Sequence, residues 1–389
     1  MRELLEESFR AAVAAADPLK ILGAHLPRPP EGRTFVAAAG KAAAAMALAV
    51  ERHWSGKLEG IAVTRYRHGL PTQHIKVVEA GHPVPDEAGE RAAAEILDQA
   101  RRLGADDLLL VLISGGGSSL LSLPAPGVTM RQMKTLTAQL LRSGADIREM
   151  NTVRKHLSAI AGGRLAAAAS RAPVLALIIS DVVGDDPTHI ASGPCAADPT
   201  TIDDAKAVLA KYGIEFRGPF SESPKTSKAT NKVIATALRS LEAAAAVFQR
   251  NGIKPLILGD TITGEAREVG AEMARLARQS KGPAALISGG ECTVTIKGEG
   301  GRGGRCSEFL LSLGIEAPHL WAIAADTDGI DGSEDNAGAV WSPALAKQPG
   351  AREALDRHDS YGFFKQAGGL VVTGPTRTNV NDYRAILVP

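Results

Sequence analysis

The sequence predicts an α/β protein built from two domains. Its 389 residues exceed what one hydrophobic core usually serves. Apolar runs of strand length alternate with segments of helical periodicity, and several of these runs end in glycine-rich or acidic loops. In doubly wound sheets ligands bind beyond the carboxyl ends of the strands, so we expect the functional residues in these loops.

Composition excludes several classes of protein. An apolar content of 44%, a charged content of 22% and a net charge of +1 leave no global field to recruit nucleic acid or an anionic membrane. The start, MRELLEESFR, lacks the apolar core of a signal peptide, and no run approaches the roughly 20 apolar residues of a membrane span. We therefore expect a cytoplasmic protein. Cys195, Cys292 and Cys306 form no C-x-x-C pair, which argues against a disulfide framework or a structural zinc site.

The first half contains two strand, glycine and helix units. The stronger one spans Leu108 to Leu123, where an apolar run meets a loop and then resumes as a helix. Its glycines permit positive φ and close approach, so the loop is a candidate cofactor phosphate site, although a tight turn without a ligand explains it equally well. The candidate residues are Ser114, Gly115, Gly116, Gly117, Ser118 and Ser119.

Lys41 follows the other strand, Thr34 to Ala39, in or near the first turn of an alanine-rich helix. The helix dipole disfavours a cation there unless an anion is bound nearby, and the alternative is a solvated lysine. His82 lies on a proline-stiffened loop at the end of the strand that starts at Ile75. This position suits a substrate contact, although a histidine that only braces its loop is the default interpretation.

Basic groups gather next on a helix that we expect Asn151 and Thr152 to cap. Arg154 and Lys155 on this helix can hold a substrate carboxylate, with a surface charge pair as the default alternative.

A strand from Val174 to Ile179 delivers Asp181 at its carboxyl end. Asp181 is our first choice for a catalytic carboxylate. The long polar loop after it contains Ser192, a candidate substrate contact, and exceeds the length of a simple connector.

The stretch 216–228 loses apolar periodicity, so we place the boundary of the two domains there: 1–228 and 229–389. After it, the loop from Gly298 to Arg305 sets arginines among glycines. Guanidinium groups match phosphate and carboxylate oxygens, so Gly301, Arg302, Gly304 and Arg305 form a candidate anion clamp.

Two further loops follow strands. Asp328 and Asp331 come just after the strand from Leu320 to Ala325 and can hold Mg²⁺, although aspartate and glycine also build turns. Asn379 belongs to a loop crowded with hydrogen-bonding side chains that can line a cleft. Together the glycine loops, the cations and the carboxylates suit phosphoryl transfer, but no Walker A pattern occurs.

Six motifs in order resemble the glycerate 2-kinase family, whose C-terminal part is called the MOFRL domain. They are ISGGGSSLLSLP, MNTVRKHLSAIAGGRLA, IISDVVGDDPTHIASGPC, GEGGRGGR, ADTDGIDG and TGPTRTNVND. The resemblance implies a Rossmann-like N-terminal domain with a mainly parallel sheet, a C-terminal domain with a mixed sheet, and an active site in the cleft between them. It also implies phosphorylation of D-glycerate, with ATP and Mg²⁺ as cofactors.

The family's essential lysine matches Lys41, and its essential arginine matches Arg305. Cys306 and Ser307 stand where the family usually has asparagine and glutamine, which puts the role of those amides in doubt. The expected partners are D-glycerate and ATP, with no nucleic acid and no membrane, and a homodimer stays open.

Two alternatives remain. Members of the family have been labelled hydroxypyruvate reductases, but no ribose-binding acid follows Gly117 at the spacing that a nicotinamide site needs. A non-catalytic sugar-acid-binding protein is the other alternative, and the charged groups at several strand ends exceed what binding alone requires.

Overall fold

A computed structural model describes residues 1–296, 298 and 300–389. The chain divides into two compact units, each with its own sheet and helices. The N-terminal unit comprises residues 18–234, and the C-terminal unit comprises residues 1–17 and 235–389. This is the predicted pair of α/β domains.

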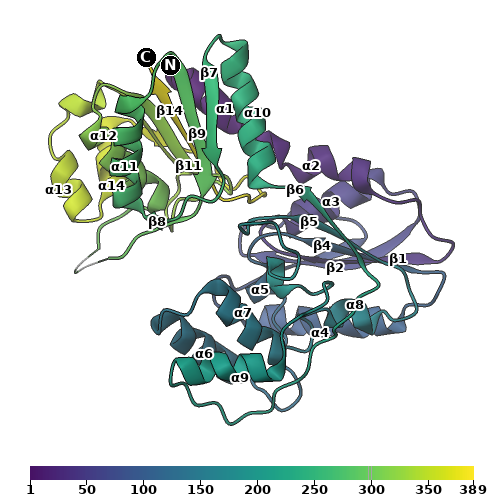
Figure 1. Cartoon of the computed structure of the whole chain (residues 1–389). Helices are drawn as coiled ribbons and strands as arrows, with labels where there is room; N and C mark the ends of the chain where they lie inside the picture. The colour runs from purple at the N-terminus through teal and green to yellow at the C-terminus, as the bar shows by residue number, and fades with distance from the viewer. Residues whose placement is uncertain (297, 299) are drawn as a thin grey trace. The chain divides into compact units, whose positions relative to one another are not determined.

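The sheet of the N-terminal unit has, in the described part of the chain, six strands in the order β3-β2-β1-β4-β5-β6 (Figure 1). Pairing is parallel from β3 through β5. This strand order is that of the doubly wound dinucleotide-binding fold, so the Rossmann-like domain with a mainly parallel sheet that the resemblance implied is confirmed. The strands are β1 (Arg33–Ala39), β2 (Lys57–Arg65), β3 (Ile75–Ala80), β4 (Leu108–Ile113), β5 (Val174–Ile179) and β6 (Thr230–Ala235).

The central strands β1 and β4 are buried on both faces of this sheet, because each is a nearly continuous apolar run. Phe35, Val111 and Ile178 pack against α4 on one face. The helices of the unit include α2 (Pro18–Ile21), α3 (Ala43–His53), α4 (Glu87–Arg102), α5 (Gly117–Leu120) and α8 (Arg164–Ala168).

A separate helical layer, α6 (Met130–Arg142), α7 (Ile147–His156) and α9 (Ile202–Lys211), encloses its own apolar cluster around Leu136, Val153 and Leu209. The prediction that Asn151 and Thr152 cap a helix is wrong. Asp146 caps α7, accepting hydrogen bonds from the backbone N–H groups of Arg148 and Glu149, which places Asn151 within the helix.

The C-terminal unit contains a mixed sheet in the order β13-β12-β11-β14-β9-β7. Among the pairings of the described strands in this sheet, only the β7–β9 pair is parallel. The strands are β7 (Lys254–Gly259), β9 (Ala284–Gly290), β11 (Trp321–Asp326), β12 (Gly338–Trp341), β13 (Leu370–Val371) and β14 (Asp382–Val388). A small two-stranded sheet pairs β8 (Gly264–Glu265) with β10 (Cys292–Thr293).

Alternation along β14 separates two cores, since successive strand residues point to opposite faces. Ala385 and Leu387 pack with α1 (Arg2–Ala15) and α10 (Ala237–Arg250). Ile386 and Val388 pack on the other face. The helices there are α11 (Ala266–Gln279), α12 (Arg305–Glu316), α13 (Ala351–Asp356) and α14 (Ser360–Ala367).

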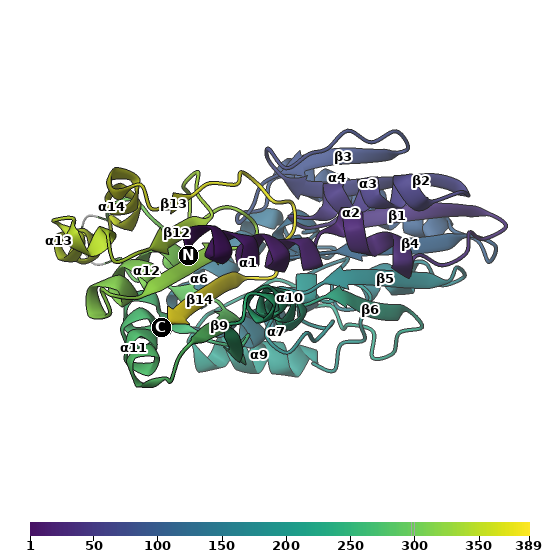
Figure 2. The ribbon, with the colours of Figure 1, turned by 90° about the horizontal axis from the view of Figure 1, so that it is seen from above.

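The division of the chain differs from the predicted boundary at residue 228 in two respects. Helix α1 belongs to the C-terminal unit, where it lies beside α10 (Figure 2). Phe9 packs against the ring of Tyr383, whose hydroxyl donates to Oγ of Ser8 at 2.7 Å. Secondly, the N-terminal unit continues to residue 234, because the segment after residue 228 forms β6, which lies next to β5 in the sheet of this unit.

Among the described residues, no helix combines the length and the apolar character needed to cross a membrane.

Candidate active site

Lys41 and the glycine loop meet at the carboxyl edge of the N-terminal sheet. Strands β1 and β4 are neighbours there, and the strand order reverses between them, which is where doubly wound folds bind ligands. The backbone N–H of Lys41 donates to the carbonyl of Gly115 at 2.8 Å, and the N–H of Ala42 donates to Oγ of Ser114 at 3.0 Å. These bonds fix the start of α3 to the loop after β4.

His82 joins this group from the end of β3. A Cβ added at Gly116 would lie 2.8 Å from Nε2 of His82 and 3.5 Å from Cγ of Lys41. Gly116 also has φ +82°, a backbone conformation that glycine adopts without strain. A glycine is therefore required here, because it lets the lysine and the histidine approach the same loop.

The glycine loop itself differs from expectation in one respect. Its helix, α5, is only four residues long rather than continuing to Leu123. Ser119 is buried, and its Oγ donates back to the carbonyl of Gly116 at 3.1 Å. Ser119 therefore supports the loop, whereas Gly115, Gly116, Gly117 and Ser118 form its turn.

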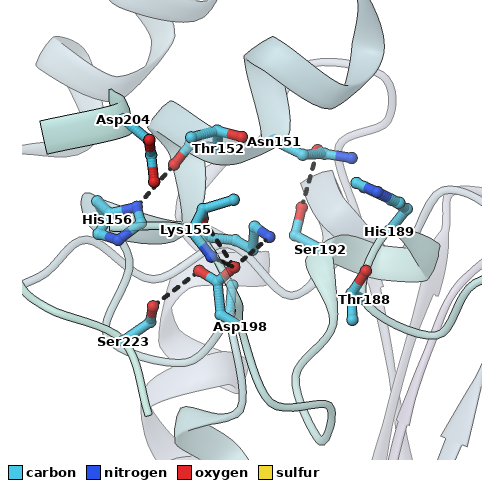
Figure 3. Close-up of polar contacts among 12 residues, drawn as sticks. Asn151, Thr152, Lys155, His156, Thr188, His189, Ser192, Asp198, Asp204 and Ser223 are labelled. Atoms are coloured by element: carbon cyan, nitrogen blue, oxygen red, sulfur yellow. Dashed lines mark hydrogen bonds and ion pairs between the residues drawn. The ribbon is translucent and has the colours of Figure 1, made fainter. Parts of the chain in front are cut away.

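Ser118, Ser192 and Asn151 form a chain of polar side chains. The two serine Oγ atoms lie 2.9 Å apart, and Ser192 donates to Oδ1 of Asn151 at 3.2 Å (Figure 3). Ser192 has φ +58° and its neighbour Ala191 has φ +51°, conformations that are uncommon for residues other than glycine. Such strain gathers at functional sites. Asn151 was not predicted as a site residue. Its place in this chain depends on the hydrogen bond from Ser192, which is 41 residues away in the sequence.

Asp181 follows β5, beside β4, at the same edge of the sheet. Its side chain is partly exposed. The sheet therefore brings Lys41, His82, the glycine loop and Asp181 to one edge, as the positions after β1, β3, β4 and β5 predicted.

Lys155 lies differently from expectation. Its Nζ donates to Oδ1 of Asp198 at 2.7 Å, and the two side chains are 1% and 0% exposed (Figure 3). Burial alone would raise the pKa of Asp198, but hydrogen bonds from Lys155, Thr200 and Ser223 outweigh it and bring that pKa to about 2. Lys155 thus anchors the loop after β5, and its ammonium group is almost completely buried.

Arg154 is partly buried between α7 and α6. It lines a small apolar cavity with Met133 and Leu136, and burial lowers the pKa of its guanidinium group. Arg154 therefore lies among residues of α6 and α7, and its role as a substrate contact stays a prediction.

In the C-terminal unit, Arg305 begins α12 and binds three carboxylates. Its Nε donates to Oδ1 of Asp382 at 2.7 Å, its Nη2 to Oδ2 of Asp326 at 2.7 Å, and its Nη1 lies 3.1 Å from Oε1 of Glu291. Burial alone would lower the pKa of Arg305, but these carboxylates raise it. The guanidinium of Arg305, which was predicted to bind an anion, is therefore already neutralised by carboxylates of the protein itself.

Asp331 caps α12 rather than facing a metal ion. Its two carboxylate oxygens accept from the backbone N–H groups of Cys306 and Ser307, both at 2.9 Å. Burial raises the pKa of Asp331 to about 6, although these donors act in the opposite direction. A Cβ at Gly304 would lie 2.2 Å from Oδ1 of Asp331, so this cap requires a glycine there.

The other predicted residues of the C-terminal unit have local contacts. Oδ1 of Asp328 accepts from the N–H of Ile330 at 2.8 Å, and Oδ1 of Asn379 accepts from the N–H of Asn381 at 3.3 Å. The guanidinium of Arg302 stacks on Tyr361, 4.2 Å from the ring centroid, and its Nε donates to Glu334. Gly301 lies against Asp359, and the neighbouring Glu299 lies outside the described residues.

Among residues 1–296, 298 and 300–389, no three His, Cys, Asp or Glu side chains are grouped so as to hold a metal ion.

Comparison with known proteins decides the family. Residues 4–221 match a family model described as a domain of unknown function, DUF4147, and residues 284–382 match the MOFRL family. A D-glycerate 2-kinase from Thermotoga maritima is 38% identical over 98% of this chain and 97% of its own length. The chain belongs to the glycerate 2-kinase family. A crystal structure of glycerate kinase from that organism superimposes with a TM-score of 0.88 at 36% identity, covering 100% of this chain and 99% of its own.

Another relative of this chain has a name that describes a different activity. A protein of Agrobacterium vitis, provisionally named a hydroxypyruvate reductase, is 50% identical over 100% of this chain and 94% of its own length. The two names describe different chemistry, so the distinction has to come from the site and from an assay.

Proposed function

We propose that this protein is an ATP-dependent kinase that phosphorylates D-glycerate and forms 2-phosphoglycerate. The observation that carries the proposal is the convergence of Lys41, the loop from Ser114 to Ser119 and Asp181 at one edge of the N-terminal sheet. A cation, a glycine loop and a carboxylate at strand ends are what phosphoryl transfer uses, because its catalysis is mostly positioning and charge neutralisation.

Lys41 neutralises the transferring phosphoryl group in this proposal. Its backbone is fixed to Gly115, so the start of its side chain is held in place before the ligand arrives. Gly116 keeps the loop free of a side chain between Lys41 and His82. His82 then contacts the substrate from the end of β3.

Asp181 accepts or orients the proton of the attacking hydroxyl group. A carboxylate suits this role if it lies within hydrogen-bond reach of that hydroxyl when glycerate is bound. Ser118, Ser192 and Asn151 offer hydroxyl and amide groups that match the hydroxyl groups of glycerate. We leave Lys155 out of the substrate contacts, since its ion pair with Asp198 is buried.

Arg305 contributes charge stabilisation from the C-terminal unit. To bind a phosphate oxygen, its guanidinium must exchange at least one of its carboxylate partners, and Glu291 is the most exposed of the three. An Arg305→Lys variant keeps the charge but loses the fork geometry that serves several oxygens at once. We expect its activity to fall sharply while α12 stays folded.

A divalent cation would balance the charge of the nucleotide phosphates when bound. Of the two predicted ligands, Asp331 does not fit, because both of its oxygens accept backbone hydrogen bonds. Asp328 is the remaining predicted ligand, and its Oδ1 accepts from the N–H of Ile330.

An assay for ADP release tests the proposal. The purified protein with ATP, Mg²⁺ and D-glycerate should release ADP, and omission of D-glycerate should abolish the release. The hydroxypyruvate reductase alternative predicts oxidation of NADH when hydroxypyruvate is supplied. NADH oxidation without glycerate-dependent ADP release would replace our proposal with that alternative.

A further inference from the structure

Arg377 is a residue of the C-terminal unit to which the proposed reaction assigns no role. It lies in the loop of residues 372–381, between β13 and β14. Its backbone has φ +59°, in the left-handed region that residues other than glycine rarely adopt. Such a conformation destabilises a folded protein and persists only where the surrounding structure enforces it, and it is concentrated at functional sites.

Hydrogen bonds on both sides of Arg377 enforce this conformation. The backbone N–H of Thr376 donates to the carbonyl of Asp328 at 3.0 Å. On the other side, Oγ1 of Thr378 donates to the carbonyl of Ala16 at 2.7 Å. The loop is therefore fixed at both neighbours of Arg377, through bonds in which the arginine side chain takes no part.

The side chain of Arg377 makes no hydrogen bond and no ion pair with any residue that the structure describes. Its Nε is buried without an acceptor, which also destabilises the fold. Nη1 and Nη2 differ from Nε, because within residues 1–296, 298 and 300–389 only Nε of this guanidinium is both buried and unpaired. The stem is thus enclosed, and the two terminal nitrogens are open to a ligand.

The charge of Arg377 is available in a way that the charge of Arg305 is not. Arg305 is neutralised by Asp326, Asp382 and Glu291. Arg377 has no such counter-ion in the described part of the chain, so an anion can reach it without displacing a carboxylate of the protein. Its planar guanidinium matches the paired oxygens of a phosphate or a carboxylate group.

The two arginines are connected to the same short segment, residues 326–328. Oδ2 of Asp326 accepts from Nη2 of Arg305 at 2.7 Å, and the carbonyl of Asp328 accepts from the residue before Arg377. This segment follows directly from β11, so both arginines depend on the carboxyl end of one strand.

We propose that Arg377 binds an oxyanion, a phosphate or a carboxylate group of a ligand of this protein, through Nη1 and Nη2. The proposed kinase has one ligand of each kind, because ATP carries phosphates and D-glycerate carries a carboxylate. The choice between these two groups rests on the proposed function. The assignment of an oxyanion rests on the strained, unpaired arginine itself.

Two variants keep the strained backbone and separate charge from geometry. Arg377→Gln removes the charge, and Arg377→Lys keeps the charge but loses the planar pair of donors. We expect Arg377→Gln to weaken the binding of either ATP or D-glycerate about tenfold or more, with Arg377→Lys between it and wild type. Binding is measured by calorimetry with each ligand alone, and by the KM of each. Arg275→Gln removes an exposed arginine of α11 and is the matched control, which should behave as wild type.

Arg377→Gly tests whether the side chain has a structural role instead. Glycine adopts φ +59° without strain, so this variant should keep a thermal midpoint no lower than that of wild type. Its ligand binding should nevertheless fall as far as that of Arg377→Gln. A clearly lower thermal midpoint would show that the side chain stabilises its loop, and it would overturn the proposal.

The outcomes separate this inference from the proposed function. A change confined to ATP identifies a phosphate group as the ligand of Arg377, and a change confined to D-glycerate identifies the carboxylate. An active enzyme in which Arg377→Gln leaves the binding of both ligands at wild-type values overturns the assignment and leaves the kinase function standing. A wild-type protein without glycerate-dependent turnover, whose binding of ATP or D-glycerate is weakened by Arg377→Gln, overturns the function and keeps the assignment.

Discussion

Nζ of Lys155 lies 2.7 Å from Oδ1 of Asp198, and neither side chain is more than 1% exposed. Breaking a buried ion pair by removing one partner leaves an uncompensated charge and costs about 3–5 kcal/mol. We therefore expect Lys155→Met to lower the free energy of unfolding by that amount, measured by urea denaturation. Adding Asp198→Leu should recover part of the loss. A stable Lys155→Met protein with only a raised KM for D-glycerate would instead make Lys155 a substrate contact.

The same pair predicts a loss of stability in acid. The pKa of Asp198 is about 2 in the folded protein and about 3.9 for an aspartate in an unfolded chain. Because the folded pKa is the lower one, the contribution of about 2 to 3 kcal/mol is complete above pH 4 to 5 and is lost as the pH falls toward 2. The difference in unfolding free energy between wild type and Asp198→Asn should narrow over this window. A constant difference from pH 6 to pH 2.5 would argue against the low pKa.

Gly116 offers a test of the close approach between the glycine loop and His82. Gly116→Ala combines the strain of φ +82° with a Cβ that would lie 2.8 Å from the imidazole. Gly144→Ala is a matched control, since Gly144 has φ +80° but no atom within 4 Å of an added Cβ. Both should lose about 1 kcal/mol from backbone strain. Only Gly116→Ala should lose a further 1–3 kcal/mol and most of its activity. Equal behaviour of the two variants is the result that rejects the contact.

Ser192 tests the chain of polar side chains that ends at Asn151. Ser192→Ala removes the group between Oγ of Ser118 and Oδ1 of Asn151. If this chain holds glycerate, the KM for D-glycerate should rise about tenfold while the KM for ATP stays within twofold. Ser170→Ala changes an exposed serine of the same unit and serves as the control. Equal changes in both KM values would assign Ser192 to the folding of its loop.

The sequence predicted those parts of the site that depend on local order. Lys41, the loop from Ser114 to Ser119 and Asp181 each follow a strand directly, so strand prediction and the rule for parallel sheets bring them to one edge. The alternation of strands with helices likewise predicted the α/β class, whereas the number of domains followed from the length of the chain. These signals act over a few residues and leave a visible pattern.

Contacts between distant residues were not predictable in this way. Lys155 and Asp198 are 43 residues apart in the sequence, and Arg305 and Asp382 are 77 residues apart. The local sequence around each residue therefore does not indicate its partner in the ion pair. The same limit applies to α1, whose amphipathic pattern predicted a helix but not its packing on α10 and Tyr383. Asp331 resembles a metal ligand in a DTDGIDG loop, yet its oxygens cap a helix 24 residues away in sequence.

Phosphorus NMR of the reaction mixture tests the proposed kinase most directly. Purified wild-type protein with ATP, Mg²⁺ and D-glycerate should produce ADP and a phosphate monoester resonance of 2-phosphoglycerate. Lys41→Met, which removes the cation beside the glycine loop, should lower kcat by about a hundredfold or more with an unchanged circular dichroism spectrum. A wild-type protein that forms no phosphoglycerate, or a Lys41→Met variant that forms it at the wild-type rate, would contradict the roles assigned to this site.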